Sequence, residues 1–123
     1  MTIALVLLGG AVGAPLRYLT DLLVQSRHDS VFPWGTFTVN ALGSLVLGAT
    51  AGAASAIPLP AWVLTLVGTG FCGALTTFST FGFETVRLLE EGSVLAAALN
   101  TTASLVVGLA ACAGGWALAV ALA

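Results

Sequence analysis

The sequence has very little charge and no lysine. Of its 123 residues 7% are charged, against about 25% in average soluble chains, whereas 59% are hydrophobic and the mean hydropathy is +1.10. A soluble domain needs a polar shell that this chain cannot supply. The shortage excludes an ordinary soluble fold, and the absence of a basic patch excludes nucleic acid as a partner.

Residue clusters of the kind that enzymes use are also missing. The single histidine, His28, lies in a polar stretch with no nucleophile–base pair or group of metal ligands in the sequence around it. Cys72 and Cys112 both fall in apolar runs, where we expect small packing residues rather than a disulfide. We therefore predict that the protein is not an enzyme.

Long apolar runs dominate what remains, since no charged residue occurs between Ser30 and Phe83 or after Glu91. Such runs are typical of membrane spans. A backbone in lipid must satisfy its own hydrogen bonds, so the spans should be helices. We predict one all-α domain over residues 1–123, in contact with membrane lipid, as a multi-pass protein of the cell (inner) membrane. Met1 and Thr2 supply no basic start for a cleaved signal peptide, so the first run should stay.

Four spans are expected, each long enough for a hydrocarbon core of about 30 Å. They lie at about Ile3–Val24, Trp34–Ile57 and Ala61–Phe83, with the fourth from Val94 toward the C-terminus and a loop over Glu84–Gly92. Four spans place both termini on one side. The loops on the other side hold only two arginines, against none in the remaining turn, so both orientations in the membrane stay open.

One polar pattern occurs twice. Asparagine, serine and glycine follow each other at i, i+4 and i+8 from Asn40 and again from Asn100. This spacing places each set along one helical face. An asparagine in a span either bonds to a neighbouring helix or faces an aqueous path, and the pattern leaves both open.

The third span contains four hydroxyl residues within Thr76–Thr80, shortly after Gly70 and Gly73. This composition predicts a helix that breaks and exposes carbonyl groups. Irregular backbone is tolerated at membrane depth only where protein buries it or water reaches it. Exposed carbonyls are ligands for a small hard cation such as sodium.

Phe78 and Phe81 should share one face of that span. Aromatic edges carry partial positive charge and can contact an anion weakly, as conduction requires, although such a pair can also simply pack. Arg17 is the only basic residue inside a span. It either pairs with Asp21 at i+4 or raises the anion concentration at a vestibule.

Three segments together resemble the CrcB/Fluc fluoride-channel family. They are Gly9–Tyr18, Trp34–Ser44 and Gly70–Phe81; they lie in the family's order, and the third is the most specific. The resemblance covers essentially the whole chain. It implies an antiparallel, dual-topology homodimer of four-helix subunits with a broken third helix and two pores. Its function would be passive, fluoride-selective export that lowers cytoplasmic fluoride.

The resemblance also implies roles for single residues. The pore would be lined by Asn40, Phe78, Ser79, Thr80, Phe81 and Ser104. Arg17 would lie near the vestibule, and the carbonyls of Gly73 and Thr76 would hold a structural sodium ion at the dimer interface. Many relatives carry a tyrosine where Asn100 aligns, which leaves the role of Asn100 open.

Two functions other than a fluoride channel fit some features of the sequence. A proton-coupled small multidrug exporter is also four-spanning and dimeric, but it needs a membrane carboxylate for cationic substrates. The first span here offers Arg17, and only Asp21 near its end. A non-transporting membrane assembly subunit would explain the many glycines but not the run of threonine, serine and phenylalanine in the third span.

Overall fold

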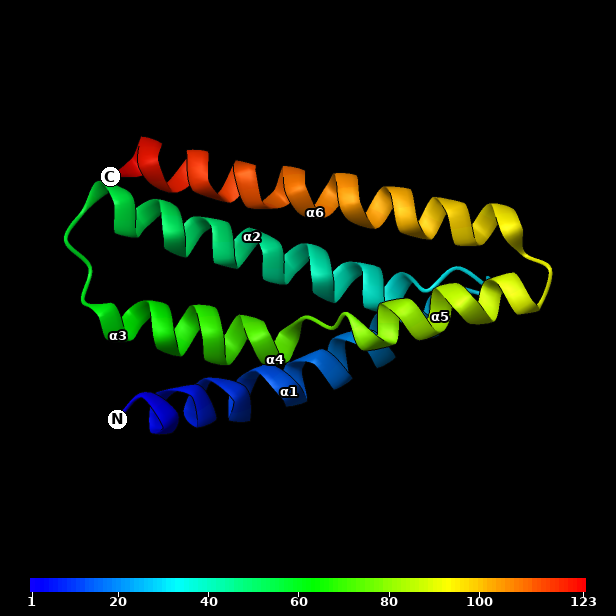
Figure 1. The fold of residues 1–123 in the computed structure, drawn as a ribbon, viewed down its shortest axis with the longest axis horizontal. Helices are drawn as coiled ribbons and strands as arrows, with labels where there is room; N and C mark the ends of the chain where they lie inside the picture. Colours follow the sequence, from blue (N-terminus) through cyan, green and yellow to red (C-terminus); the bar gives the residue numbers. More distant parts are fainter.

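The computed structural model describes all 123 residues as a bundle of helices without strands (Figure 1). Four helices are long and apolar enough to cross a membrane. They are α1 (Thr2–Ser26), α2 (Trp34–Ala56), a third span over Ala61–Glu90 and α6 (Val94–Leu122). The predicted all-α fold with four spans is therefore confirmed.

The third span consists of several pieces. It begins with α3 (Ala61–Val63), continues as a π-helix, η1 (Leu64–Cys72), and closes with one turn of α4 (Gly73–Leu75). The backbone then leaves the helix at Thr76, whose ψ is 159°, and resumes as α5 (Ser79–Glu90). The predicted break is confirmed, and it lies within the hydroxyl-rich segment.

The prediction that this span ends at Phe83, with a loop over Glu84–Gly92, is wrong. Helix α5 continues to Glu90, because charged side chains can project from a helix that has left the hydrocarbon core. The helix ends at Gly92, whose φ of 82° suits glycine. The N–H groups of Gly92 and Ser93 donate to the carbonyls of Leu89 and Leu88, a Schellman ending.

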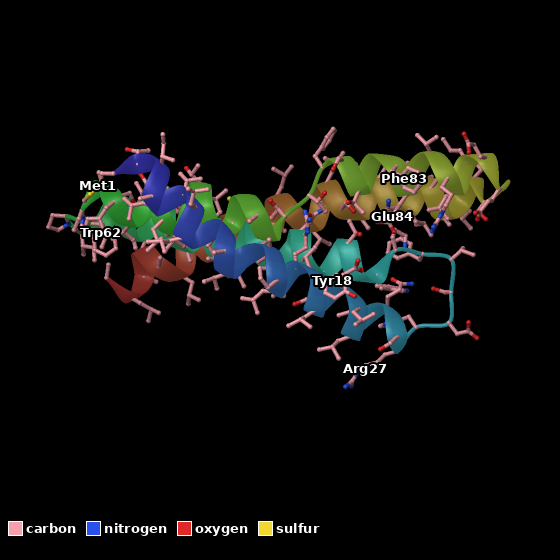
Figure 2. All side chains as sticks on the ribbon, turned by 90° about the horizontal axis from the view of Figure 1, so that it is seen from below. Met1, Tyr18, Arg27, Trp62, Phe83 and Glu84 are labelled. Carbon is pink, nitrogen blue, oxygen red and sulfur yellow. The ribbon has the colours of Figure 1, made fainter.

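Both termini lie at one end of the bundle, beside the turn that joins α2 to α3 (Figure 1). The α1–α2 and α5–α6 connections lie at the opposite end. Figure 2 shows the same division, with Met1 and Trp62 at one end and Arg27, Phe83 and Glu84 toward the other. The chain therefore crosses the bundle four times, as the span count predicted.

Helices α2 and α6 run side by side in the same direction (Figure 1). A Cβ at Gly52 would lie 2.6 Å from the carbonyl oxygen of Trp116, and one at Gly115 would lie 2.8 Å from the backbone nitrogen of Ala49. Gly48 is pressed against the backbone of Cys112 in the same way. The two helices thus touch backbone to backbone, which small residues permit inside membranes.

Helix α1 packs in the same manner on the first half of the third span. A Cβ at Gly9 would lie 2.6 Å from the backbone nitrogen of Phe71, and one at Gly70 would lie 2.9 Å from the carbonyl oxygen of Val6. Gly13 also meets the backbone of Phe71. The bundle therefore consists of two pairs, α1 with the first half of the third span and α2 with α6. The helices of each pair run in the same direction and touch at glycine residues.

Candidate functional site

A cavity of about 370 Å³ lies beside the break in the third span, between α2, η1, α5 and α6. Six of the residues predicted from the sequence line it. They are Asn40, Gly73, Thr76, Phe78, Phe81 and Ser104. No aspartate, glutamate, arginine or histidine contributes to its wall. We call it the inner cavity; it is a chamber of aromatic, hydroxyl, amide and backbone groups without fixed charge.

Asn40 holds the broken backbone. Its Oδ1 accepts the N–H of Thr77 at 2.7 Å, and its Nδ2 donates to the carbonyl of the same residue at 3.0 Å. The side chain of Asn40 thus supplies both partners that a continuous helix would have given Thr77. An asparagine amide carries two N–H donors, so one remains free at the cavity wall.

Four successive carbonyl groups before the break, those of residues 73–76, receive no hydrogen bond, and two of them belong to residues of the predicted sodium site. The N–H of Thr77 bonds to Asn40 rather than to Gly73. The N–H of Thr80, in the first turn of α5, bonds at 3.2 Å to the hydroxyl of Thr77, two residues before the helix begins. The carbonyls of Gly73 and Thr76 are left without partners in the backbone, although both residues line the inner cavity.

Phe78 and Phe81 place their rings at the start of α5. The ring centroids are 6.0 Å apart and the planes meet at 44°. Phe78 is 84% exposed on the surface of the single chain, whereas Phe81 is half-buried. Two aromatic groups therefore line the inner cavity, and one of them, Phe78, is largely uncovered on the single chain.

Ser79, Thr80 and Arg17 lie outside the inner cavity. Thr80 lines a second, smaller cavity of about 170 Å³ together with Arg17 and Asp21. Ser79 is exposed, and its hydroxyl is 3.4 Å from that of Thr77. The predicted residues thus fall into two groups, separated by the backbone around Thr77.

No ion pair joins Arg17 to Asp21, which was one of the two interpretations of this arginine. The single ion pair of the chain is between Arg87 and Glu91, at 3.8 Å, and both side chains are about half exposed. Arg17 and Asp21 instead share the wall of the small cavity. The interpretation of Arg17 as the partner of Asp21 in an ion pair is therefore not supported.

A third cavity, of about 380 Å³, lies at the end of the bundle that carries the α1–α2 loop. Its polar wall is formed by Asp21, Gln25, Ser30, Glu84, Arg87 and Glu91. Asp21 belongs to this outer cavity and to the small one, and Thr77 belongs to the small one and to the inner cavity. Each pair of neighbouring cavities thus has one wall residue in common.

Three contributing residues were missed by reasoning from sequence. Thr77 bonds through its backbone to the Asn40 amide and through its hydroxyl to the N–H of Thr80, whereas the sequence marks it only as one hydroxyl among four. Thr85 fell in the wrongly predicted loop, and its hydroxyl accepts from Nδ2 of Asn100 at 2.9 Å. Thr36 donates from its hydroxyl to the carboxylate of Glu84 and so ties α2 to α5.

Comparison with known proteins places the chain in a family. Residues 4–116 match the family described as CrcB-like protein, Camphor Resistance (CrcB). A protein of Frankia casuarinae named fluoride-specific ion channel FluC 1 is 59% identical over 120 residues, covering 94% of this chain and 93% of the relative.

Two further relatives agree with that match. A protein of the same name from Streptomyces avermitilis is 58% identical over 113 residues, covering 91% of each chain. Another from Thermobifida fusca is 49% identical over 111 residues, covering 90% of this chain and 89% of the relative. The match extends over nearly all of four helices able to span a membrane. The chain therefore belongs to the CrcB family of membrane proteins.

Proposed function

We propose that this chain is the subunit of a passive, fluoride-selective channel of the cell membrane. Its relatives are named fluoride-specific ion channels, which supports the proposal. The observation that carries the proposal is the inner cavity, which lies at a helix break and has no charged side chain in its wall. An ion can pass such a chamber without being trapped, because conduction needs contacts that are weak enough to release it. The absence of a carboxylate there gives no support to a proton-coupled exporter.

Fluoride is small and strongly hydrated, so a path for it must replace water with close donors. The free N–H of Asn40 and the edges of Phe78 and Phe81 are such donors. Ser104 also lines the chamber, although its hydroxyl donates to Oδ1 of Asn100 at 3.3 Å. Export would follow the membrane potential, which is worth about 2.3 kcal/mol per charge for each 100 mV.

The remaining predicted residues fit an earlier part of the path. Arg17 and Thr80 line the small cavity between the outer opening and the break. There the guanidinium would raise the local concentration of anions, and the hydroxyl of Thr80 would contact them. Ser79 is exposed on the single chain and would join the path only where a second subunit covers it.

A second copy of the chain is part of the proposal. The face that carries Gly73 and Phe78 is exposed, and unpaired carbonyls on such a face cannot meet lipid without cost. An antiparallel homodimer, with one subunit in each orientation, would cover that face and give two pores. The small arginine asymmetry between the two sides of the chain is compatible with dual topology.

A sodium ion is the proposed structural cofactor. The unpaired carbonyls of Gly73 and Thr76 are hard oxygen donors of the kind that bind alkali cations, so the residues fit such an ion. Two carbonyls are too few for one chain to hold it, whereas a twofold-related copy would double the number. The ion would stabilise the interface by neutralising these carbonyl dipoles.

Fluoride efflux from liposomes containing the purified protein tests the function, with chloride efflux as the control. We expect rapid fluoride release and little chloride release. Vesicles that retain fluoride would exclude the proposal. Exchanging external sodium for another monovalent cation should leave fluoride flux unchanged at first, and an immediate sodium-dependent current would indicate co-transport instead.

A further inference from the structure

Asn100 occupies a position that the proposed ion path does not use. We infer that Asn100 is a positioning residue: through Thr85 it holds α5 against α6, and together with Asn40 it fixes both ends of a segment that carries Phe78 and Phe81. The inference rests on the proposed function, because it concerns how the aromatic donors are aimed into the inner cavity.

Of the two hydrogen bonds of the Asn100 side chain, one joins α6 to α5, and the other, from the Ser104 hydroxyl, lies within α6. Asn100 is 1% exposed, and its Nδ2 donates to the hydroxyl of Thr85 at 2.9 Å. The Thr85 hydroxyl donates in turn to the carbonyl of Phe81 at 2.8 Å. Asn100 is thus connected through one side chain to the backbone of a cavity residue, although it is not part of the cavity wall.

The two asparagines bond to different points of the third span. The reason is that the residue offset between the two copies of the sequence pattern differs from the offset between residues of α2 and α6 that pack at the same level. Gly48 faces Cys112 and Gly52 faces Trp116, an offset of 64 residues between α2 and α6, whereas Asn40 and Asn100 differ by 60. Asn100 therefore lies about one helical turn from the level of Asn40. One asparagine bonds to Thr77, and the other bonds to Thr85, eight residues later.

Two attachment points are needed because α5 follows a break. The direction of α5 is not determined by η1, because the helix is interrupted between them. A Cβ at Gly82, the one glycine inside α5, would meet nothing within 4 Å, so no close backbone contact holds the helix there. A helix held only at Thr77 could swing about that point. The Thr36–Glu84 hydrogen bond ties α5 to α2, and the hydrogen bond at Thr85, about 12 Å beyond Thr77 along a helix, ties α5 to α6. Holds on two neighbouring helices fix the tilt and rotation of α5, and with them the rings of Phe78 and Phe81.

Thr85→Val tests the hold with little change in side-chain shape. Thr101→Val is the matched control, because the Thr101 hydroxyl donates to Ala97 within α6 and to no other helix. One interhelical hydrogen bond is worth about 1 kcal/mol, so Thr85→Val should slow fluoride efflux about 3- to 10-fold. It should also lower the ratio of fluoride to chloride flux, while Thr101→Val and Thr85→Ser should retain wild-type values.

A residue with only a stabilising role would give a different result. Thr85→Val would then lower the melting temperature and leave the fluoride-to-chloride ratio unchanged, which would overturn the inference. Asn100→Leu, which preserves volume, is the second variant if Thr85→Val does not fold, and we expect the same loss of selectivity from it.

Amide hydrogen exchange over Ser79–Arg87 measures the hold whether or not the wild type conducts. We expect faster exchange in Thr85→Val than in Thr101→Val. Equal exchange in the two variants would contradict the positioning role, whereas a wild type that conducts no fluoride would refute the proposed function alone.

Discussion

The two halves of the third span are held by different means. The first half, Ala61–Leu75, is pressed against α1 by glycines, with backbone meeting backbone at Gly9, Gly13 and Gly70. The second half, α5, has no such contact and is held through side chains. Leu88 is fully buried, Thr36 and Asn100 each donate one hydrogen bond to α5, and Asn40 bonds to the backbone just before it. The first half is thus fixed by backbone contacts and supports the cavity, whereas the second half is held by side chains and carries the aromatic groups of the cavity.

The difference lies in how each contact responds to change. A close backbone contact leaves no room for an added atom, and overpacking costs about 1–3 kcal/mol. A hydrogen bond between membrane helices contributes about 1 kcal/mol and can be re-formed in another geometry. Variants in the first half should therefore affect assembly, and variants in the second half should affect conduction.

The largest effect is expected from Gly9→Ala. The new Cβ would lie 2.6 Å from the backbone nitrogen of Phe71, which cannot move aside as a side chain could. We expect a loss of about 3 kcal/mol, seen as aggregation or a much lower melting temperature in detergent. The neighbouring Gly10→Ala is the control, since its Cβ would meet only the Cβ of Ala74 at 3.8 Å. Equal stability of the two variants would refute the idea of a fixed half.

Phe81→Ile should come next, as a loss of function without a loss of assembly. Isoleucine fills part of the space but has no aromatic edge, so fluoride flux should fall by at least about tenfold. Flux from liposomes and the elution volume of the protein measure the two properties separately. Phe83→Ile is the control, because Phe83 is 67% exposed and does not line the inner cavity. Normal flux in Phe81→Ile would remove the aromatic-edge role.

Asn40→Asp should impair flux by about tenfold at neutral pH. The carboxylate can still accept the N–H of Thr77, but it cannot donate to the Thr77 carbonyl, and it brings a negative charge into an uncharged chamber. Ser55→Ala is the control, because the Ser55 hydroxyl donates to the carbonyl of Gly52 within α2 and Ser55 does not line the inner cavity. If both variants conduct equally, Asn40 serves packing alone.

Arg87→Ala should have the smallest effect. The ion pair with Glu91 is 3.8 Å long and half exposed, so its removal should change stability by less than about 0.5 kcal/mol. Thermal unfolding measures this directly. A loss well above that value would mean that the exposed end of α5 is held by charge as well as by Asn100.

The fold could largely be predicted from the sequence, because length and hydropathy determine where a chain can cross a membrane. The break at Thr76 could also be predicted from the clustered hydroxyl groups. The end of α5 could not be predicted. The charges of Glu84 and Arg87 indicate that the chain there contacts water, but they do not indicate whether it is helical. Charge marks the membrane boundary and not the end of a helix.

The candidate site could be predicted only in part. Residues on the third span were found because they are adjacent in sequence. The pairing of Asn100 with Thr85 was not, because it depends on the register between α5 and α6. The same holds for Arg17: i+4 spacing allows a pair with Asp21, but the structure places both side chains at one cavity without an ion pair.

The clamp of Asn40 on Thr77 has a consequence for how the protein forms. The segment 61–90 contains no proline, and the break contains no residue with positive φ, so nothing within it forbids an uninterrupted helix. Its clustered hydroxyl groups favour a break, and the Asn40 side chain from α2 supplies the hydrogen-bond partners that keep the break open. We therefore expect the third span to enter the bilayer as an ordinary continuous helix and to open only when its neighbour docks, so that the ion path arises with tertiary assembly and not with insertion.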